Sequence, residues 1–191
     1  MMVRGTEDRP QQFHKLSNRI LIQANKGLPR LEFLRQILHM IWEFSHYDFI
    51  GLWVEEKEKY VQCSMIAEDE YRVMIHPSSA GSGSLPIIMH DDGLNSLRLN
   101  MFSGETLTDE YVTAFGSYWT EDAQLTADPA FTESGNKNDG PFTITKCRSL
   151  ALIPLDIGDK TIGLLEIGCR EPARLTYEEV ELYEGLARLL G

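Results

Sequence analysis

Two apolar segments near the end of the chain, joined by a short polar one, constrain the fold most strongly. Ser149–Leu155 and Thr161–Cys169 consist almost entirely of apolar residues and include many that favour strands. Between them, Asp156–Lys160 has the Asp and Gly content of a hairpin turn. Because both segments are apolar at nearly every position, we expect an antiparallel hairpin in a sheet that is covered on both faces.

Helices that could cover such a sheet are predicted at both ends of the chain. Gln11–Asn25 and Arg30–Phe44 carry apolar residues at helical spacing. A third helix is expected to begin at Thr176, where Glu179 stands at the position that completes a capping box. The pattern therefore predicts helices before and after the strands.

Two further strands are predicted directly after the second helix. Phe49–Val54 and Tyr60–Ile66 have strand composition, and the charged stretch between them indicates a hairpin. The long middle, residues 67–147, has weaker signals: Leu85–Met89 suggests a strand, Gly93–Phe102 a short helix and Thr132–Gly140 a polar loop. This order predicts the α+β class, an antiparallel sheet with helices packed on it.

Charge and hydropathy narrow the possible partners and location. The formal net charge of −11 argues against a nucleic-acid partner, because phosphate backbones attract clustered Lys and Arg. The longest apolar segments are shorter than the roughly 20 residues that span a bilayer, and the first residues lack a signal-peptide core. We therefore expect a cytoplasmic domain without membrane contact, with residues 1–10 as a linker or disordered segment and 11–191 as a single domain.

The last third of the chain resembles the GAF domain. The resemblance rests on Ser149–Leu155 with its terminal Pro-Leu, on Ile162–Ile167 with its hydrophobic-Gly start, and on Leu175-Thr176 at the helix start. Gly116–Thr120 (GSYWT) also resembles a stretch found in GAF domains that accompany PAS domains in bacterial sensor histidine kinases. Two features depart from that group: Lys146-Cys147-Arg148 replaces its Gly-aromatic-Glu run, and Leu99-Asn100-Met101 stands where the group tends to have a cysteine ahead of the Gly-Ser motif.

The resemblance implies both an architecture and a role. It implies a central antiparallel sheet of about six strands, with the terminal helices on one face and the long irregular middle on the other. The implied role is sensory or regulatory, within a larger bacterial signal-transduction protein such as a two-component sensor histidine kinase. Catalytic activity would then lie in another part of that protein.

A ligand pocket in this family would lie between the sheet and the variable middle segment. Five aromatic residues could form its walls and two arginines could contact a polar ligand: Tyr111, Phe115, Tyr118, Trp119, Phe131, Arg98 and Arg148. His76 and His90 are further polar candidates, although no third metal ligand accompanies them. The alternative is that the aromatic residues form a satellite core under a long loop.

No signature of a known GAF cofactor is present in the sequence. The Asn-Lys-Phe-Asp-Glu pattern of cyclic-nucleotide GAF domains is missing, and no cysteine adjoins a histidine as bilin attachment requires. Cys63, Cys147 and Cys169 are widely spaced and are expected to be buried apolar residues. The alternative function is a small thiol-dependent enzyme, similar to methionine sulfoxide reductases of GAF fold, that uses Cys147.

The terminal helices offer a route to a homodimer. In many GAF proteins the first and last helices pack against their copies in a parallel dimer and connect to neighbouring signalling domains. Leu16, Ile20, Val180, Tyr183, Ala187 and Leu190 could form such a seam, or could instead pack on the domain's own sheet. A pure dimerisation spacer without a pocket is a third possibility.

Overall fold

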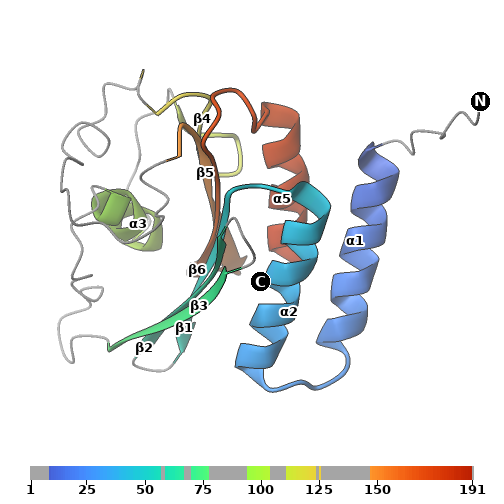
Figure 1. Ribbon diagram of the computed structural model, residues 1–191. Helices are drawn as coiled ribbons and strands as arrows, with labels where there is room; N and C mark the ends of the chain where they lie inside the picture. Colours follow the sequence, from blue (N-terminus) through green and yellow to red (C-terminus); the bar gives the residue numbers. More distant parts are fainter. Residues whose placement is uncertain are drawn as a thin grey trace, which may run out of the picture.

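A single antiparallel sheet forms the centre of the molecule (Figure 1). The computed structural model describes residues 9–56, 59–66, 70–77, 94–103, 111–123, 125 and 147–190. The sheet has six strands in the order β3-β2-β1-β6-β5-β4. Their bounds are β1 Phe49–Glu56, β2 Lys59–Ile66, β3 Glu70–Pro77, β4 Tyr118–Thr120, β5 Ser149–Ile157 and β6 Lys160–Cys169. Each neighbouring pair is antiparallel, so the predicted C-terminal hairpin is confirmed as β5–β6.

The hairpins meet at the centre of the sheet, where β1 pairs with β6. Two glycines make this arrangement possible. Gly158 in the β5–β6 turn has a φ of 61°, which favours glycine because it has no Cβ. A Cβ on Gly163 would collide with the backbone carbonyl oxygen of Trp53 on the neighbouring strand. The hydrophobic-Gly pair at the start of β6 therefore lets β1 and β6 approach closely.

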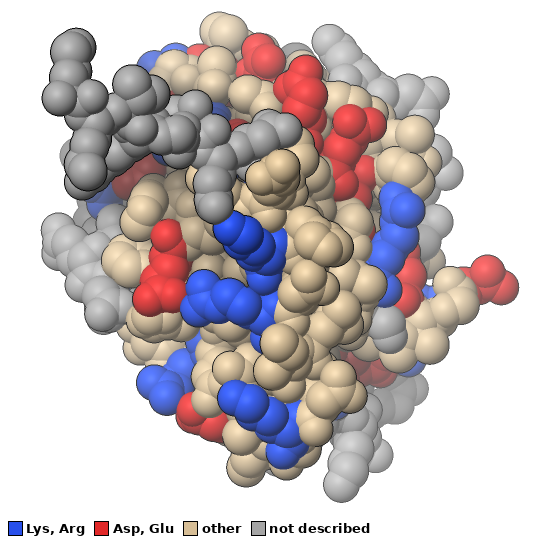
Figure 2. All heavy atoms as spheres, turned by 90° about the vertical axis from the view of Figure 1, so that its right-hand side faces the viewer, with Lys and Arg blue, Asp and Glu red and all other residues tan. Residues whose placement is uncertain are grey.

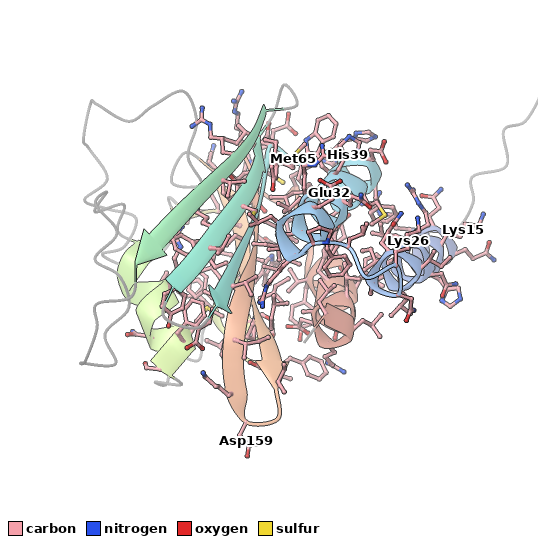
Figure 3. All side chains as sticks on the ribbon, turned by 90° about the horizontal axis from the view of Figure 1, so that it is seen from below. Lys15, Lys26, Glu32, His39, Met65 and Asp159 are labelled. Carbon is pink, nitrogen blue, oxygen red and sulfur yellow. The ribbon has the colours of Figure 1, made fainter. Side chains whose placement is uncertain are left out.

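Three helices cover one face of the sheet and a fourth element covers the other (Figure 1). Helices α1 (Arg9–Ala24), α2 (Arg30–Ser45) and α5 (Tyr177–Leu190) form the first layer. Helix α3 (Leu94–Ser103) lies on the opposite side. In Figure 3, Met65 of β2 lies on the side of the sheet that faces α2, whereas Lys15 and Lys26 lie on the outer side of the helix layer. The main core fills the space between the sheet and this layer.

Helices α1 and α5 run side by side in the same direction. Arg9 forms an ion pair with Glu179, at 2.7 Å, and one turn further along each helix the rings of Phe13 and Tyr183 meet edge to face, with centroids 5.5 Å apart. Both phenyl rings are buried. The first and last helices thus form one packed unit on the sheet.

The start of α5 is fixed by two sets of hydrogen bonds. The backbone N–H of Glu179 donates to Thr176 Oγ1 and the N–H of Thr176 donates to a Glu179 carboxylate oxygen, each at 3.3 Å, so the predicted capping box is confirmed. The N–H of the preceding Leu175 donates to Ser149 Oγ at 3.1 Å. The Leu-Thr pair therefore ties the last helix to the first residue of β5.

The structure confirms the α+β class and the sheet of about six strands with the terminal helices on one face. Strands β3 and β4 were not predicted, because β3 lies in a weakly patterned region and β4 has only three residues. The expected strand at Leu85–Met89 and loop at Thr132–Gly140 lie outside the described residues. The division into a linker at 1–10 and a domain at 11–191 stays a prediction, with α1 beginning at Arg9.

Most of the residues expected at a dimer seam pack on the domain's own sheet. Leu16, Ile20, Val180, Tyr183 and Ala187 are buried in the main core, and Leu190 packs against it. The apolar residues that the helix layer exposes are others, among them Leu21, Ile22 and Leu189. None of the described helices has the length and apolar character that a bilayer-spanning segment needs.

Candidate functional site

The two faces of the sheet differ in chemistry. The face toward α1, α2 and α5 is lined by aliphatic residues such as Leu52 and Leu165. The face toward α3 carries polar side chains among its apolar ones. Ser64, Gly51 and Glu166 lie directly opposite one another on β2, β1 and β6, so they share this face. Both Ser64 and Glu166 are buried, and Glu166 is 0% exposed.

A buried ion pair occupies the centre of the α3 face. Arg98 Nε of α3 donates to Glu166 Oε1 at 2.5 Å, and both side chains are almost completely shielded from solvent. The Arg98 guanidinium also lies over the Trp53 ring, 5.3 Å from its centroid. The cost of desolvating two charges offsets most of their attraction, so a buried pair of this kind adds little net stability.

Hydrogen-bonding capacity remains beside this pair. Glu166 Oε2 and Gln62 Oε1 are buried and have no hydrogen-bond partner within the part of the chain that the structure describes. A Cβ on Gly51 would lie 3.1 Å from Glu166 Oε2, so the missing side chain leaves room for the carboxylate. Buried acceptors are normally paired, so a hydrogen-bond donor that reached these two oxygens would satisfy them. We call Arg98, Glu166, Trp53, Gln62 and Ser64 the Arg98–Glu166 cluster.

Aromatic residues surround the Arg98–Glu166 cluster on the same face. Tyr118 of β4 is buried, and its ring centroid lies 5.9 Å from that of Tyr111. Tyr60 of β2 and Phe102 of α3 meet edge to face at 5.3 Å. These contacts belong to a second apolar cluster, which holds α3 against β1, β5 and β6. Charge, hydrogen-bond acceptors and aromatic surface are thus combined in one region.

The predicted ligand contacts are distributed over several environments. Arg98 and Tyr118 lie on the α3 face, with Tyr111 beside them. Trp119 follows Tyr118 along β4 and faces the helix layer, where its Nε1–H donates to the Leu175 carbonyl oxygen at 3.0 Å. Successive side chains of a strand point to opposite faces, which separates these two neighbours. Even so, Tyr111 and Trp119 line one cavity of about 460 Å³ at the sheet edge.

The remaining predicted contacts lie elsewhere. Arg148 pairs with Asp122, and its Nε donates to Oδ1 at 3.1 Å. Phe115 is 50% exposed beneath the guanidinium of Arg188. Phe131, His90 and the side chain of His76 lie outside the described residues. No group of three His, Cys, Asp or Glu side chains that could hold a metal occurs where the structure is described.

Glu166 was not predicted from the sequence, although a signal for it exists. It is the only charged residue between Thr161 and Cys169, in a strand that is otherwise apolar. A charge at the centre of a sheet covered on both faces must find a partner. That partner, Arg98, comes from the weakly patterned middle of the chain, so the pair could not be assigned without the fold.

The cysteines show no sign of activation. Cys63, Cys147 and Cys169 are free and buried. Burial raises the pKa of all three thiols: that of Cys169 to about 12, with the nearby Asp48 carboxylate adding to the effect, and that of Cys147 well above its ordinary value. Reactive thiols have lowered pKa values and access to solvent, and these three have neither.

Comparison with solved structures identifies the fold. The chain is similar to free methionine-R-sulfoxide reductase from Neisseria meningitidis, with a TM-score of 0.57, 11% identity and coverage of 100% of this chain and 92% of that one. It is similar to the GAF domain of a phosphoenolpyruvate-protein phosphotransferase from Coxiella burnetii (TM-score 0.59, 16% identity, 96% and 92% covered). It is also similar to the GAF domain of the Acinetobacter phosphoenolpyruvate-protein phosphotransferase, with a TM-score of 0.56, 15% identity and coverage of 93% of this chain and 89% of that one.

These likenesses establish the GAF fold, as the resemblance of the sequence implied. No family model and no curated protein sequence matches the chain. At sequence identities this low, the comparisons show the fold and not the function. The same fold occurs both in a GAF domain of a larger protein and in a reductase.

Proposed function

We propose that this chain is a sensory or regulatory domain that binds a small polar ligand at the Arg98–Glu166 cluster. The proposal rests on two buried acceptors, Glu166 Oε2 and Gln62 Oε1, which have no hydrogen-bond partner in the described part of the chain and share a face of the sheet with the buried Arg98. A ligand with hydrogen-bond donors would satisfy both oxygens. The aromatic residues around them would supply apolar contact area.

The fold offers a path from this cluster to the helix layer. Glu166 faces α3, whereas Leu165 and Ile167 on either side of it belong to the core beneath α1, α2 and α5. A ligand that shifts β6 would therefore alter the surface on which the terminal helices rest. We expect the ligand to favour one packing of these helices, and the output domain to respond to that population.

The wider context extends the proposal. GAF domains of several kinds belong to larger bacterial proteins, and one of the similar structures comes from a phosphotransferase of the phosphoenolpyruvate type. A two-component sensor histidine kinase is our preferred context, because of the resemblance carried by Gly116–Thr120. The reaction itself would then belong to a neighbouring domain, in a bacterial cytoplasm.

A thiol-dependent enzyme is the second candidate. The similarity to a free methionine-R-sulfoxide reductase favours it, since that enzyme shares the fold over nearly the whole chain. The raised pKa and the burial of Cys147 argue for the regulatory proposal instead. Activity on free methionine sulfoxide with a thiol reductant would establish the second candidate.

Ligand binding can be tested with a matched pair of variants. The experiment measures thermal shifts of the protein with a panel of nucleosides, purines, sugars and organic acids. Gln62→Leu removes one unpaired acceptor of the cluster, whereas Gln36→Leu makes the same change on α2, where Gln36 donates to Glu32. We expect Gln62→Leu to weaken the binding of any stabilising compound at least tenfold and Gln36→Leu to leave it unchanged. Equal effects of the two variants would contradict the proposed site.

A further inference from the structure

A second cavity, of about 370 Å³, lies between helix α5 and the edge of the sheet. Strand β4 begins at Tyr118, opposite Leu152, so it does not pair with β5 from Ile153 onward. The cavity opens beside this stretch and is lined by Ile153, Pro154 and Asp156 of β5 and by Phe115, Ser117, Glu184 and Arg188. The Asp156 carboxylate accepts a hydrogen bond from Thr161 Oγ1. It borders α5 on the helix side of the sheet, whereas the Arg98–Glu166 cluster lies on the α3 side.

Two of the residues that line this cavity each carry a buried polar atom without a hydrogen-bond partner among the described residues. Glu184 of α5 is 2% exposed; Thr113 Oγ1 donates to its Oε1, and its Oε2 has no hydrogen-bond partner among residues that the structure describes. Ser117 is fully buried, and its Oγ likewise has none there. The N–H of Ser117 donates to Thr113 Oγ1 at 3.2 Å, which holds Ser117 close to Glu184. A carboxylate and a hydroxyl at one site suit a group with several N–H donors.

A cation completes the cavity at its exposed side. Arg188 lies one helical turn after Glu184, yet its guanidinium carbon is placed 3.8 Å from the centre of the Phe115 ring. Glu184 Oε2 forms no hydrogen bond with the Arg188 guanidinium. Positions four residues apart on a helix lie on the same face, so Glu184 and Arg188 both line this cavity. Their charges are not joined by a hydrogen bond.

We propose that this cavity binds a small zwitterion of the α-amino acid type. Its primary ammonium group donates to Glu184 Oε2 and Ser117 Oγ, and its carboxylate accepts from the Arg188 guanidinium. Ile153 and Pro154 supply an apolar wall for the carbon chain. The volume of the cavity lies in the range of small-molecule sites.

Such binding would act directly on the last helix. Glu184 and Arg188 both belong to α5, whereas Ser117 and Phe115 belong to the segment that leads into β4. A zwitterion held between them would tie α5 to that segment and so stabilise one position of the helix. The site is independent of the proposed ligand site on the α3 face.

The test is a thermal-shift titration of the protein with each of the twenty common L-amino acids. At least one should raise the melting temperature by about 5–10 °C at a hundredfold excess over its Kd. The matching amine without the carboxylate, and the matching acid without the ammonium group, should each bind at least tenfold more weakly. Absence of any shift, or equal binding of a compound with a single charged group, overturns the proposal.

Variants assign the binding to this cavity. Arg188→Gln and Ser117→Ala should each raise the Kd at least tenfold, whereas Arg35→Gln, a matched change at an exposed arginine of α2, should not. Gln62→Leu should also leave amino-acid binding unchanged, which separates this site from the Arg98–Glu166 cluster. Arg188 is exposed, so its replacement leaves the core intact even if Ser117→Ala is poorly folded. Unchanged binding in Arg188→Gln would contradict the proposal.

Discussion

Among the single residues, Arg98 and Glu166 are the most unusual, because they place opposite charges where the sheet and α3 exclude water. Such pairs contribute little net stability, since desolvation offsets most of the attraction. Ligand binding by the Arg98–Glu166 cluster would account for a buried ion pair that adds little stability. The two charges should therefore depend strongly on each other.

A double-mutant cycle measures this dependence. Arg98→Leu leaves Glu166 buried without its partner and should lower the free energy of unfolding by about 3–5 kcal/mol. Combining it with Glu166→Leu removes both charges and should recover much of that loss. Urea denaturation gives the free energies of all four proteins. Additive losses in the double variant would show that the charges are not coupled.

The thiols provide a second test at this scale. Because the pKa values of Cys63, Cys147 and Cys169 are raised, little thiolate forms at pH 8 in the folded protein. We expect the native protein to react with iodoacetamide far more slowly than the protein in urea, where all three cysteines become accessible. Mass spectrometry of the alkylated products follows each site. Rapid modification of native Cys147 would instead favour the thiol-dependent enzyme.

At the scale of the elements, the close approach of β6 to β1 determines which residue fits at one position of β6. Gly163 passes the Trp53 carbonyl oxygen so closely that no side chain fits there. Apart from its chain neighbours and the surrounding backbone of α5, a Cβ on Gly185 would have no described atom within 4 Å. The same substitution should therefore have opposite effects at the two sites.

Gly163→Ala should destabilise the protein by about 1–3 kcal/mol, because β1 and β6 must move apart. Gly185→Ala should stabilise it by about 0.5–1 kcal/mol, since alanine favours the helix over glycine. Chemical denaturation of the two variants beside the wild type checks both signs. A tolerated alanine at position 163 would mean that the close approach of the strands is not needed.

How far the sequence predicts an element depends on the length and regularity of its pattern. The β5–β6 hairpin and the terminal helices have long apolar patterns and were predicted within a few residues. Strand β4 is too short to show any period, and Trp119 and Tyr118 were therefore assigned to one aromatic pocket although they face opposite sides of the sheet. Glu166 and Arg98 meet only through a tertiary contact between β6 and α3, which periodicity cannot reveal.

At the scale of the whole molecule, the described part of the helix layer exposes apolar side chains on its outer surface. Figure 2 views this face and shows basic and acidic side chains separated by areas of uncharged residues. Ile22 of α1 is 60% exposed and Leu189 of α5 is 48% exposed, whereas the apolar residues beneath them are buried. We propose that a parallel homodimer uses these exposed residues.

Sedimentation velocity tests the dimer. We expect the wild-type protein to sediment as a dimer and Ile22→Lys to shift it to the monomer, because a charge at the centre of an apolar contact is costly to bury. Lys15→Ala, a change of similar size at a charged position of α1, serves as the control. A dimer that persists in Ile22→Lys would mean that another surface forms the contact.

Native mass spectrometry measures whether the Arg98–Glu166 cluster binds a small ligand. Freshly purified protein, before and after incubation with a bacterial metabolite extract, is compared with its denatured mass. We expect a reproducible extra mass that is lost on denaturation and is absent from the Arg98→Leu, Glu166→Leu double variant. A wild-type protein that shows only its bare mass under both conditions, or one whose every extra mass persists in the double variant, would contradict binding at the cluster.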